Sequence, residues 1–180
     1  MPLANYITFL RIILILPIMY LTNIGTVQAN FFSLALFLLA GFTDYLDGYI
    51  ARKTNTESGL GALLDLVADK LLVCIVLVWL IIINSTPIYV VPVLLIIFRE
   101  LTISSIRQYI VEKEGKNNIE VSLLGKSKTT VQFIAISFMI ISPGLGHFFK
   151  ILSLSLIWLS ALISIVSLYT YLLSWRNKFK

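Results

Sequence analysis

The chain has very little charge for its length. Only 13% of its 180 residues are charged, whereas soluble domains carry roughly 25%. Hydrophobic residues make up 58%, and the mean hydropathy is +0.94. Because the hydrophobic residues extend through the whole chain, the composition excludes a soluble domain and also a soluble domain with one anchor. It predicts an integral membrane protein.

Cysteine and histidine are nearly absent, with one residue of each type. Cys74 cannot form a disulfide within the chain, and its position in an apolar run predicts a packing role. His147 falls in a turn between two hydrophobic stretches. A metal site built from a cluster of Cys and His is therefore excluded.

Polar breaks divide the hydrophobic sequence into six stretches, which predict an all-α fold with six transmembrane helices. A membrane-spanning helix needs roughly 20 mostly apolar residues. The first twenty residues lack a charged region and a small-residue cleavage site, so we expect a retained helix there rather than a signal peptide. No repeat or soluble domain is detected, and residues 1–180 are expected to form one membrane domain. The expected helices are 4–23, 31–52, 60–83, 88–111, 127–142 (short, and extending back to about 122) and 148–174.

The positions of Lys and Arg predict how the helices are oriented. With six spans, both termini lie on one side of the membrane, and nine cations fall on that side against only Lys150 on the other. The positive-inside rule then places the termini and both basic loops in the cytoplasm. The small size and the lack of a targeting segment predict a bacterial inner membrane, and an organelle protein stripped of its transit peptide is the alternative. These loops can also attract anionic lipid headgroups, but the chain has no soluble basic face for nucleic acid. The nine are Arg52, Lys53, Lys113, Lys116, Lys126, Lys128, Arg176, Lys178 and Lys180.

Four aspartates lie within two of the hydrophobic stretches. Asp44 and Asp47 are three residues apart and Asp65 and Asp69 are four apart, so each pair shares one face of its helix. A carboxylate inside a bilayer costs several kcal/mol unless a partner compensates it. Four of them within 26 residues suggest a shared divalent cation, and oxygen ligands suit Mg²⁺ or Mn²⁺. Such a set could hold two ions for displacement at phosphorus.

Small residues and one arginine accompany the acids. Gly48, Ala51 and Gly61 share their helix faces and leave room for a substrate or for close helix contact. Arg52 offers a fixed fork of donors suited to a phosphate or diphosphate. Intramembrane acids also occur in ion channels and proton relays, so a small Mg²⁺ channel or carrier is the alternative. A carrier would need acids along a pore, whereas these acids cluster toward one membrane face.

The spacing of these residues resembles the complete signature of the CDP-alcohol phosphotransferase family. The resemblance covers essentially the whole chain and implies a six-helix, homodimeric membrane transferase. Such an enzyme moves a substituted phosphate from a CDP-linked donor to an alcohol and releases CMP. The matching string is Asp44-x2-Asp47-Gly48-x2-Ala51-Arg52-x8-Gly61-x3-Asp65-x3-Asp69.

The family resemblance also implies roles for the matching residues. Asp44, Asp47, Asp65 and Asp69 would bind two Mg²⁺ ions, or Mn²⁺, and Asp69 would also be the general base for the acceptor hydroxyl. The shorter Asn5-x2-Thr8-x2-Arg11 is similar to an N-terminal element that approaches the donor, although Arg11 could instead snorkel toward the membrane surface. The residues implied for the donor site are Asn5, Thr8, Arg11, Gly48, Ala51, Arg52 and Gly61.

A second polar group lies in the fourth and fifth hydrophobic stretches. Arg99 and Arg107 are eight residues apart and therefore near one helix face, and Lys126 and Lys128 precede the fifth stretch. Two arginines and two lysines exceed what the CDP diphosphate needs, and a phosphate on the acceptor would explain the surplus. Alternatively, Arg99 and Glu100 are structural partners of other polar groups, and the lysines only set topology.

Both segments resemble the phosphatidylglycerophosphate synthase branch of the family, whose acceptor is sn-glycerol 3-phosphate. This resemblance implies transfer of the phosphatidyl group from CDP-diacylglycerol to glycerol 3-phosphate. Two other activities in the family remain open: a cardiolipin synthase, which accepts phosphatidylglycerol, and a phosphatidylinositol-phosphate synthase, which accepts inositol phosphate. The residues expected at the acceptor are Arg99, Glu100, Ser104, Arg107, Lys126 and Lys128.

Overall fold

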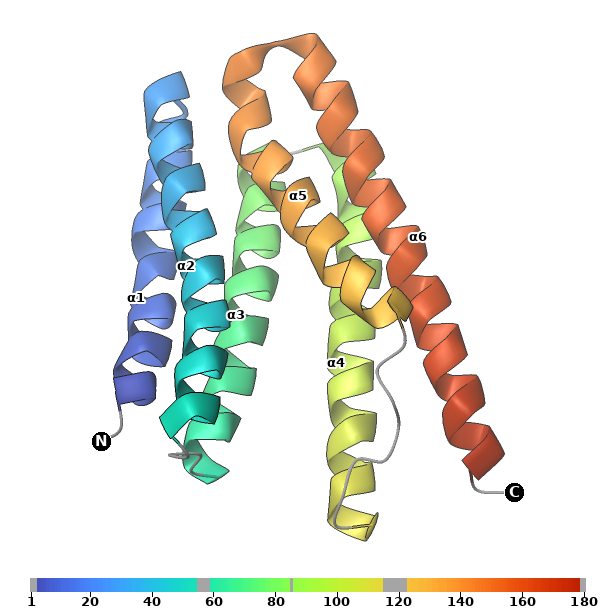
Figure 1. The fold of residues 1–180 in the computed structure, drawn as a ribbon. Coiled ribbons are helices and arrows are strands. Elements are labelled where there is room, and N and C mark those ends of the chain that lie inside the picture. The colour runs from blue at the N-terminus through green and yellow to red at the C-terminus, as the bar shows by residue number, and fades with distance from the viewer. Residues whose placement is uncertain (1–2, 55–58, 85, 115–122, 179–180) are drawn as a thin grey trace. The chain divides into compact units, whose positions relative to one another are not determined.

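The structure is a computed structural model in which every described element is a helix (Figure 1). It describes residues 3–54, 59–84, 86–114 and 123–178, except for the side chains of 3–7, 44–54, 59–66, 111–114, 123–127, 175 and 177–178. Six long α-helices and one short 3₁₀ helix follow one another, which confirms the all-α prediction for these residues. The helices are α1 (Leu3–Ile24), α2 (Val27–Thr54), α3 (Gly59–Asn84), η1 (Pro87–Tyr89), α4 (Val90–Glu114), α5 (Leu123–Leu145) and α6 (His147–Lys178).

Two connections are shorter than the sequence predicts. The expected break at 23–30 shrinks to Gly25 and Thr26, because Gly25 adopts a left-handed φ of 73° that glycine tolerates without strain. Thr26 then caps α2, since its hydroxyl accepts a hydrogen bond from the Ala29 amide at 3.3 Å. Similarly, α5 continues through Pro143 to Leu145, and only Gly146, with φ 93°, separates it from α6.

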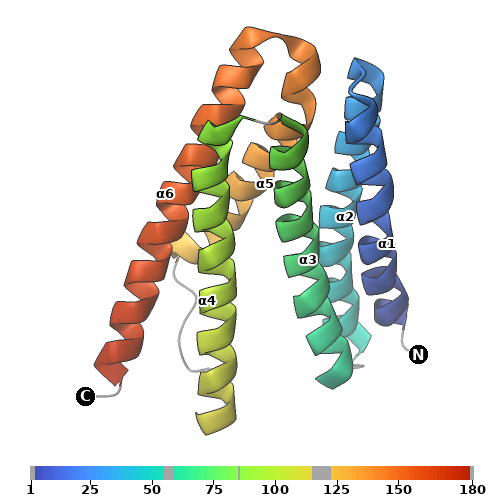
Figure 2. The same ribbon diagram turned by 180° about the vertical axis from the view of Figure 1, so that it is seen from behind.

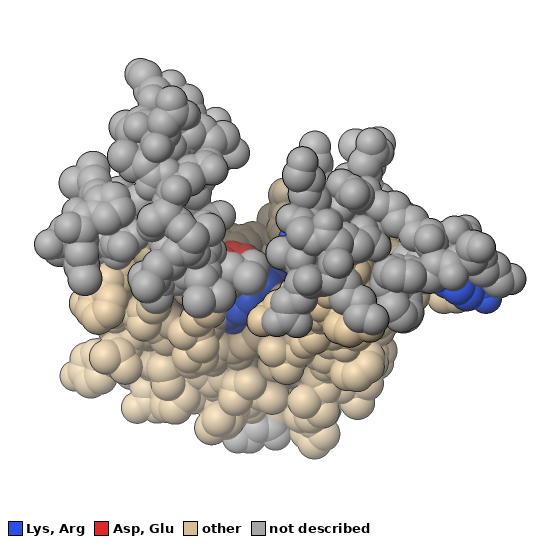
Figure 3. Space-filling model, turned by 90° about the horizontal axis from the view of Figure 1, so that it is seen from below, with Lys and Arg blue, Asp and Glu red and all other residues tan. Residues whose placement is uncertain are grey.

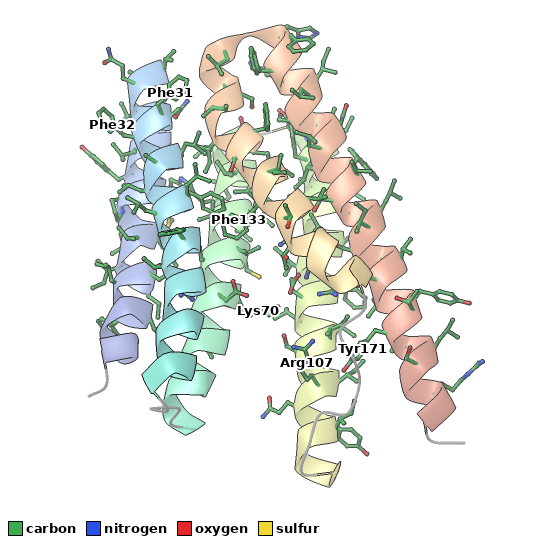
Figure 4. The ribbon with its side chains drawn as sticks, viewed as in Figure 1. Phe31, Phe32, Lys70, Arg107, Phe133 and Tyr171 are labelled. Atoms are coloured by element: carbon green, nitrogen blue, oxygen red, sulfur yellow. The ribbon has the colours of Figure 1, made fainter. Side chains whose placement is uncertain are left out.

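Large apolar side chains cover the exposed surface of the helices. Leu16 is 69% exposed, Phe32 68% and Phe148 70%, and Figure 4 shows Phe32 pointing outward from α2. Tan atoms, which are neither acidic nor basic, also make up most of the described surface seen in Figure 3. Such continuous apolar exposure is unfavourable in water and suits lipid contact.

The lengths of the helices also indicate a membrane environment. Among the described residues, four helical segments are long and apolar enough to cross a membrane: Val67–Asn84, Pro87–Ile110, Lys128–Leu145 and His147–Ser174. Shorter apolar segments occupy Thr8–Ile24 and Val27–Thr43. The chain is therefore a multi-pass membrane protein, and the count of six spans stays a prediction.

The chain forms two compact units, of which the first contains α1, α2, α3 and the end of α5. Helices α1, α2 and α3 pack against one another (Figures 1 and 2). The Trp79 indole N–H links α3 to α1, where it donates to the Met19 carbonyl at 3.1 Å and the Thr22 hydroxyl at 3.0 Å. The Ser33 hydroxyl links α2 to α1 by donating to the Ile18 carbonyl at 3.3 Å. These bonds fix the halves of the helices that lie away from the aspartates.

The second unit contains η1, α4, the first part of α5 and most of α6. The Tyr89 and Ser153 hydroxyls share a buried hydrogen bond of 2.8 Å between η1 and α6. Farther along α4, polar side chains again join the helices, and they belong to the candidate site described next. Four serines along α6 are buried at spacings of seven, four and three residues, which places them on one helix face. They are Ser153, Ser160, Ser164 and Ser167.

Candidate functional site

The aspartate motif runs along two consecutive helices of the first unit. Asp44 and Asp47 lie on the second half of α2, and Asp65 and Asp69 lie on the first half of α3. Helical geometry therefore keeps each pair on one face, as the spacing predicts. The side chains of Asp44, Asp47 and Asp65 lie outside the described residues, as do those of Asn5, Gly48, Ala51, Arg52, Gly61 and Lys126.

Three side chains of the predicted donor and metal site are described. Thr8 and Arg11 lie one turn apart on α1, and both are buried, with Arg11 completely inaccessible. This burial is inconsistent with the alternative in which Arg11 snorkels to the surface. Asp69 is half-buried on α3, beside Lys70, which is labelled in Figure 4. A buried guanidinium on α1 thus belongs to the same compact unit as the acidic ends of α2 and α3.

The carboxylate oxygens that α2 and α3 offer as ligands fit a hard divalent cation. Each helix contributes a pair of carboxylates at helical spacing, and Asp69 shows that this stretch of α3 keeps a carboxylate partly away from solvent. Oxygen ligands of this kind are those of Mg²⁺ and Mn²⁺. Among the residues whose side chains are described, there is no group of three or more acidic, Cys or His residues.

A buried ion-pair cluster occupies the centre of the second unit. Glu100 on α4 is 3% exposed, and one of its carboxylate oxygens, Oε1, contacts two cations. Lys128 Nζ donates to it from α5, and Arg99 Nη1 lies 3.4 Å away from it on α4. Lys128 is also 3% exposed. It is therefore a buried cation, although the prediction of orientation included it among the nine cations of the cytoplasmic side.

A serine on α6 completes the cluster. Arg99 Nη2 donates to the Ser167 hydroxyl at 2.9 Å, so that Arg99 connects α4 to α6 while Glu100 connects α4 to α5. Arg107 lies two turns from Arg99 on the same helix and is half-buried, as is Ser104 between them. Arg107 and Tyr171 both lie close enough to Arg99 to influence its ionisation. The structure therefore brings Arg99, Glu100, Arg107 and Lys128 into one region, and their role at the acceptor stays a prediction.

Several buried polar atoms around this cluster have no hydrogen-bond partner among the residues that the structure describes. Three are donors, Arg99 Nε, Arg107 Nε and the Tyr171 hydroxyl, and Gln132 Oε1 on α5 is an acceptor. Gln132 follows Lys128 by one helical turn, and Tyr171 follows Ser167 by one turn. Buried polar groups in folded proteins nearly always have partners, so this pattern is typical of a ligand site.

The cluster is rich in cations. Arg99, Arg107 and Lys128 supply three positive charges and Glu100 supplies one negative charge, which leaves plus two among these four described side chains. The guanidinium groups of the arginines match the geometry of phosphate oxygens, so this region has the chemistry to bind a phosphate.

The contribution of α6 and of Gln132 on α5 was not predicted from the sequence. Ser167, Tyr171 and Gln132 belong to no motif and stand in otherwise hydrophobic helices. The one signal was spacing: Ser160, Ser164, Ser167 and Tyr171 recur every three or four residues, which marks one polar face. That signal alone does not distinguish a site from close helix packing.

Known proteins resemble the chain over nearly its full length. The model of the family described as CDP-alcohol phosphatidyltransferase matches residues 1–167. A CDP-diacylglycerol–glycerol-3-phosphate 3-phosphatidyltransferase from Rickettsia typhi is 36% identical, with 98% of each chain covered. Proteins of the same name are 34% identical in Rickettsia bellii, over 98% of this chain and 97% of the relative, and 33% identical in Haemophilus influenzae, over 93% and 89%.

The shared carboxylate of Glu100 generates a prediction about stability. Glu100→Gln should lower the free energy of unfolding in detergent by about 3–5 kcal/mol, because it leaves buried cations without a counter-charge. Lys128→Met should cost less, since Arg99 still balances Glu100. In the double variant the two losses should not add. A larger loss for Lys128→Met than for Glu100→Gln would contradict this account of the cluster.

Proposed function

The chain belongs to the CDP-alcohol phosphatidyltransferase family, and from this premise we propose that it transfers the phosphatidyl group from CDP-diacylglycerol to sn-glycerol 3-phosphate. The products would be phosphatidylglycerol phosphate and CMP. The observation that carries the choice of acceptor is the buried cluster around Glu100, whose described side chains hold a net charge of plus two. The name shared by the relatives supports the same donor and acceptor.

The donor would bind to the first unit. Thr8 and Arg11 on α1 are buried, and with Asn5, Gly48, Ala51, Arg52 and Gly61 they would hold the CDP portion. Small residues at 48, 51 and 61 leave room for the nucleotide, and the arginines would donate to the diphosphate oxygens. The diacyl chains would remain among the apolar side chains that face the lipid.

The metal site of the proposal consists of Asp44, Asp47, Asp65 and Asp69. Two Mg²⁺ ions, or Mn²⁺, bound there would neutralise the diphosphate and stabilise the charge that develops on it during transfer. Asp69 would take the proton of the acceptor hydroxyl, whose oxygen then attacks the lipid-bearing phosphorus. The bond from that phosphorus to the bridging oxygen breaks, and CMP leaves with the bonding electron pair.

The acceptor would bind through its phosphate in the second unit. Arg99 and Arg107 have buried Nε donors without a described partner, which would bind phosphate oxygens together with Lys126 and Lys128. Glu100 would contribute by holding Arg99 and Lys128 in place, and Ser104 would lie between the two arginines on α4. A phosphate monoester carries close to two negative charges at neutral pH, which matches the net charge of the cluster.

This charge balance favours some acceptors over others. Phosphatidylglycerol, the acceptor of a cardiolipin synthase, offers a phosphodiester with one negative charge and would leave part of the cluster uncompensated. Inositol phosphate is also a monoester, so charge alone does not separate it from glycerol 3-phosphate, whereas the relatives' shared name favours glycerol 3-phosphate. A Mg²⁺ carrier would have no use for a buried anion site.

The setting of the enzyme is also part of the proposal. We expect six membrane spans in one domain over residues 1–180, with the termini and the active site on the cytoplasmic side of the inner membrane. Family membership favours a homodimer.

An acceptor panel tests the proposed function. Purified protein, labelled CDP-diacylglycerol and Mg²⁺ would be mixed with glycerol 3-phosphate, glycerol, phosphatidylglycerol or inositol phosphate, and CMP release measured. Glycerol 3-phosphate should give the highest kcat/KM, and glycerol should be slower by at least about a hundredfold, because it leaves buried cations unpaired. Preference for phosphatidylglycerol would overturn the acceptor assignment, and CMP release with no acceptor dependence would overturn the activity.

Replacing Asp69 tests the assigned base. Asp69→Asn should reduce CMP release by more than about a hundredfold, since general bases contribute factors of that size and the residue would also be a metal ligand. Val78→Ala, at an exposed position on the same helix, is the matched control and should leave activity unchanged. Thermal unfolding would verify that both variants fold. Full activity in folded Asp69→Asn protein would remove Asp69 from the mechanism.

A further inference from the structure

Tyr171 is a half-buried residue of α6 with a buried hydroxyl, and it belongs to none of the family motifs. Its hydroxyl is inaccessible to solvent and has no hydrogen-bond partner among the described residues. A buried tyrosine hydroxyl usually finds a partner, because a missing hydrogen bond in the interior costs about 1–3 kcal/mol. The exception therefore points to a partner that binds from outside the protein.

The position of Tyr171 connects it to the buried cluster. It follows Ser167 by one turn on α6, and Ser167 accepts a hydrogen bond from Arg99 at 2.9 Å. Tyr171 and Arg107 both lie close enough to Arg99 to influence its ionisation, and Figure 4 shows the Tyr171 side chain extending from α6 toward α4. The hydroxyl thus belongs with the arginines of α4 rather than with the lipid-facing side of α6.

The chemistry of the neighbouring groups limits what the missing hydrogen-bond partner of Tyr171 can be. Arg99 Nε and Arg107 Nε can only donate hydrogen bonds, and both lack a described acceptor. The Tyr171 hydroxyl has its own proton to donate. Three unpartnered donors, two of them on guanidinium cations, call for one group that carries several acceptor oxygens and negative charge. A phosphate is such a group, because it offers several acceptor oxygens and a negative charge that suits the arginines.

We infer that the Tyr171 hydroxyl donates a hydrogen bond to the phosphate of the acceptor and is a specificity-determining residue. This inference rests on the proposed function, in which Arg99 and Arg107 bind the same phosphate. Tyr171 makes α6 part of the acceptor site, because it adds a neutral donor to the cations of α4 and α5. Its hydrogen bond increases the affinity for acceptors that bear a phosphate monoester and does not increase the affinity for acceptors that lack one.

Tyr171→Phe is the direct test, because it removes the hydroxyl and keeps the ring. Tyr169→Phe is the matched control, since Tyr169 lies two residues away on α6 and is 63% exposed. For both variants, the KM values for glycerol 3-phosphate and CDP-diacylglycerol, the inhibition by inorganic phosphate and the thermal unfolding midpoint would be measured. Equilibrium binding of labelled glycerol 3-phosphate provides a readout that does not require turnover.

In Tyr171→Phe, the KM for glycerol 3-phosphate and the inhibition constant of phosphate should both rise about tenfold, as expected for a lost hydrogen bond to a charged group. The KM for CDP-diacylglycerol and the unfolding midpoint should stay unchanged, and Tyr169→Phe should match the unaltered protein. Unchanged phosphate inhibition in Tyr171→Phe would overturn the inference. Equal increases in both KM values together with a lower unfolding midpoint would also overturn it, because they indicate a structural role.

The same experiment separates this inference from the proposed function. If the unaltered protein uses glycerol 3-phosphate and Tyr171→Phe behaves identically, the function stands and the role of Tyr171 is wrong. If the unaltered protein shows no turnover but binds labelled glycerol 3-phosphate, and Tyr171→Phe weakens this binding, the role stands and the activity is wrong. Absence of both turnover and binding in the unaltered protein would overturn both.

Discussion

The second unit depends on one buried carboxylate. Glu100 Oε1 contacts Lys128 of α5 and Arg99 of α4, and Arg99 in turn donates to Ser167 of α6. These contacts join three helices that also pack through apolar side chains and through the Tyr89–Ser153 hydrogen bond. The same contacts gather cations of the second unit in the region where the proposed acceptor phosphate would bind.

The helices could be predicted from sequence because lipid imposes a simple rule on length and composition. All six long helices confirm the hydrophobic stretches, and the differences fall at their ends. Gly25 and Gly146 reverse the chain within one or two residues by adopting positive φ, and α5 continues through Pro143. Polar composition near 23–30 suggested a longer loop, but Thr26 uses its polar atoms to cap α2, which hydropathy cannot reveal.

The candidate site was predictable only where its residues are close in sequence. The spacing of Asp65 and Asp69 predicts that they share one face of a helix, and the same holds for Arg99 and Arg107. The partner of Lys128 was not predictable, because Glu100 lies 28 positions away, and the sequence placed that lysine among the loop cations. Ser167 lies 68 positions from Arg99, and Tyr171 has no neighbouring motif. Both became recognisable only when folding placed α6 beside α4.

We propose that the basic residues of the second unit bind the phosphate of the acceptor and not that of the donor. The most direct measurement is the KM of each substrate for Arg107→Ala, with Gln108→Ala, an exposed neighbour on α4, as the control. Loss of a hydrogen bond to a charged group should raise the KM for glycerol 3-phosphate about 10- to 100-fold. The KM for CDP-diacylglycerol should stay unchanged, and the control should match the unaltered protein. An equal rise in both KM values, or a rise for CDP-diacylglycerol alone, would contradict the account and place Arg107 at the donor.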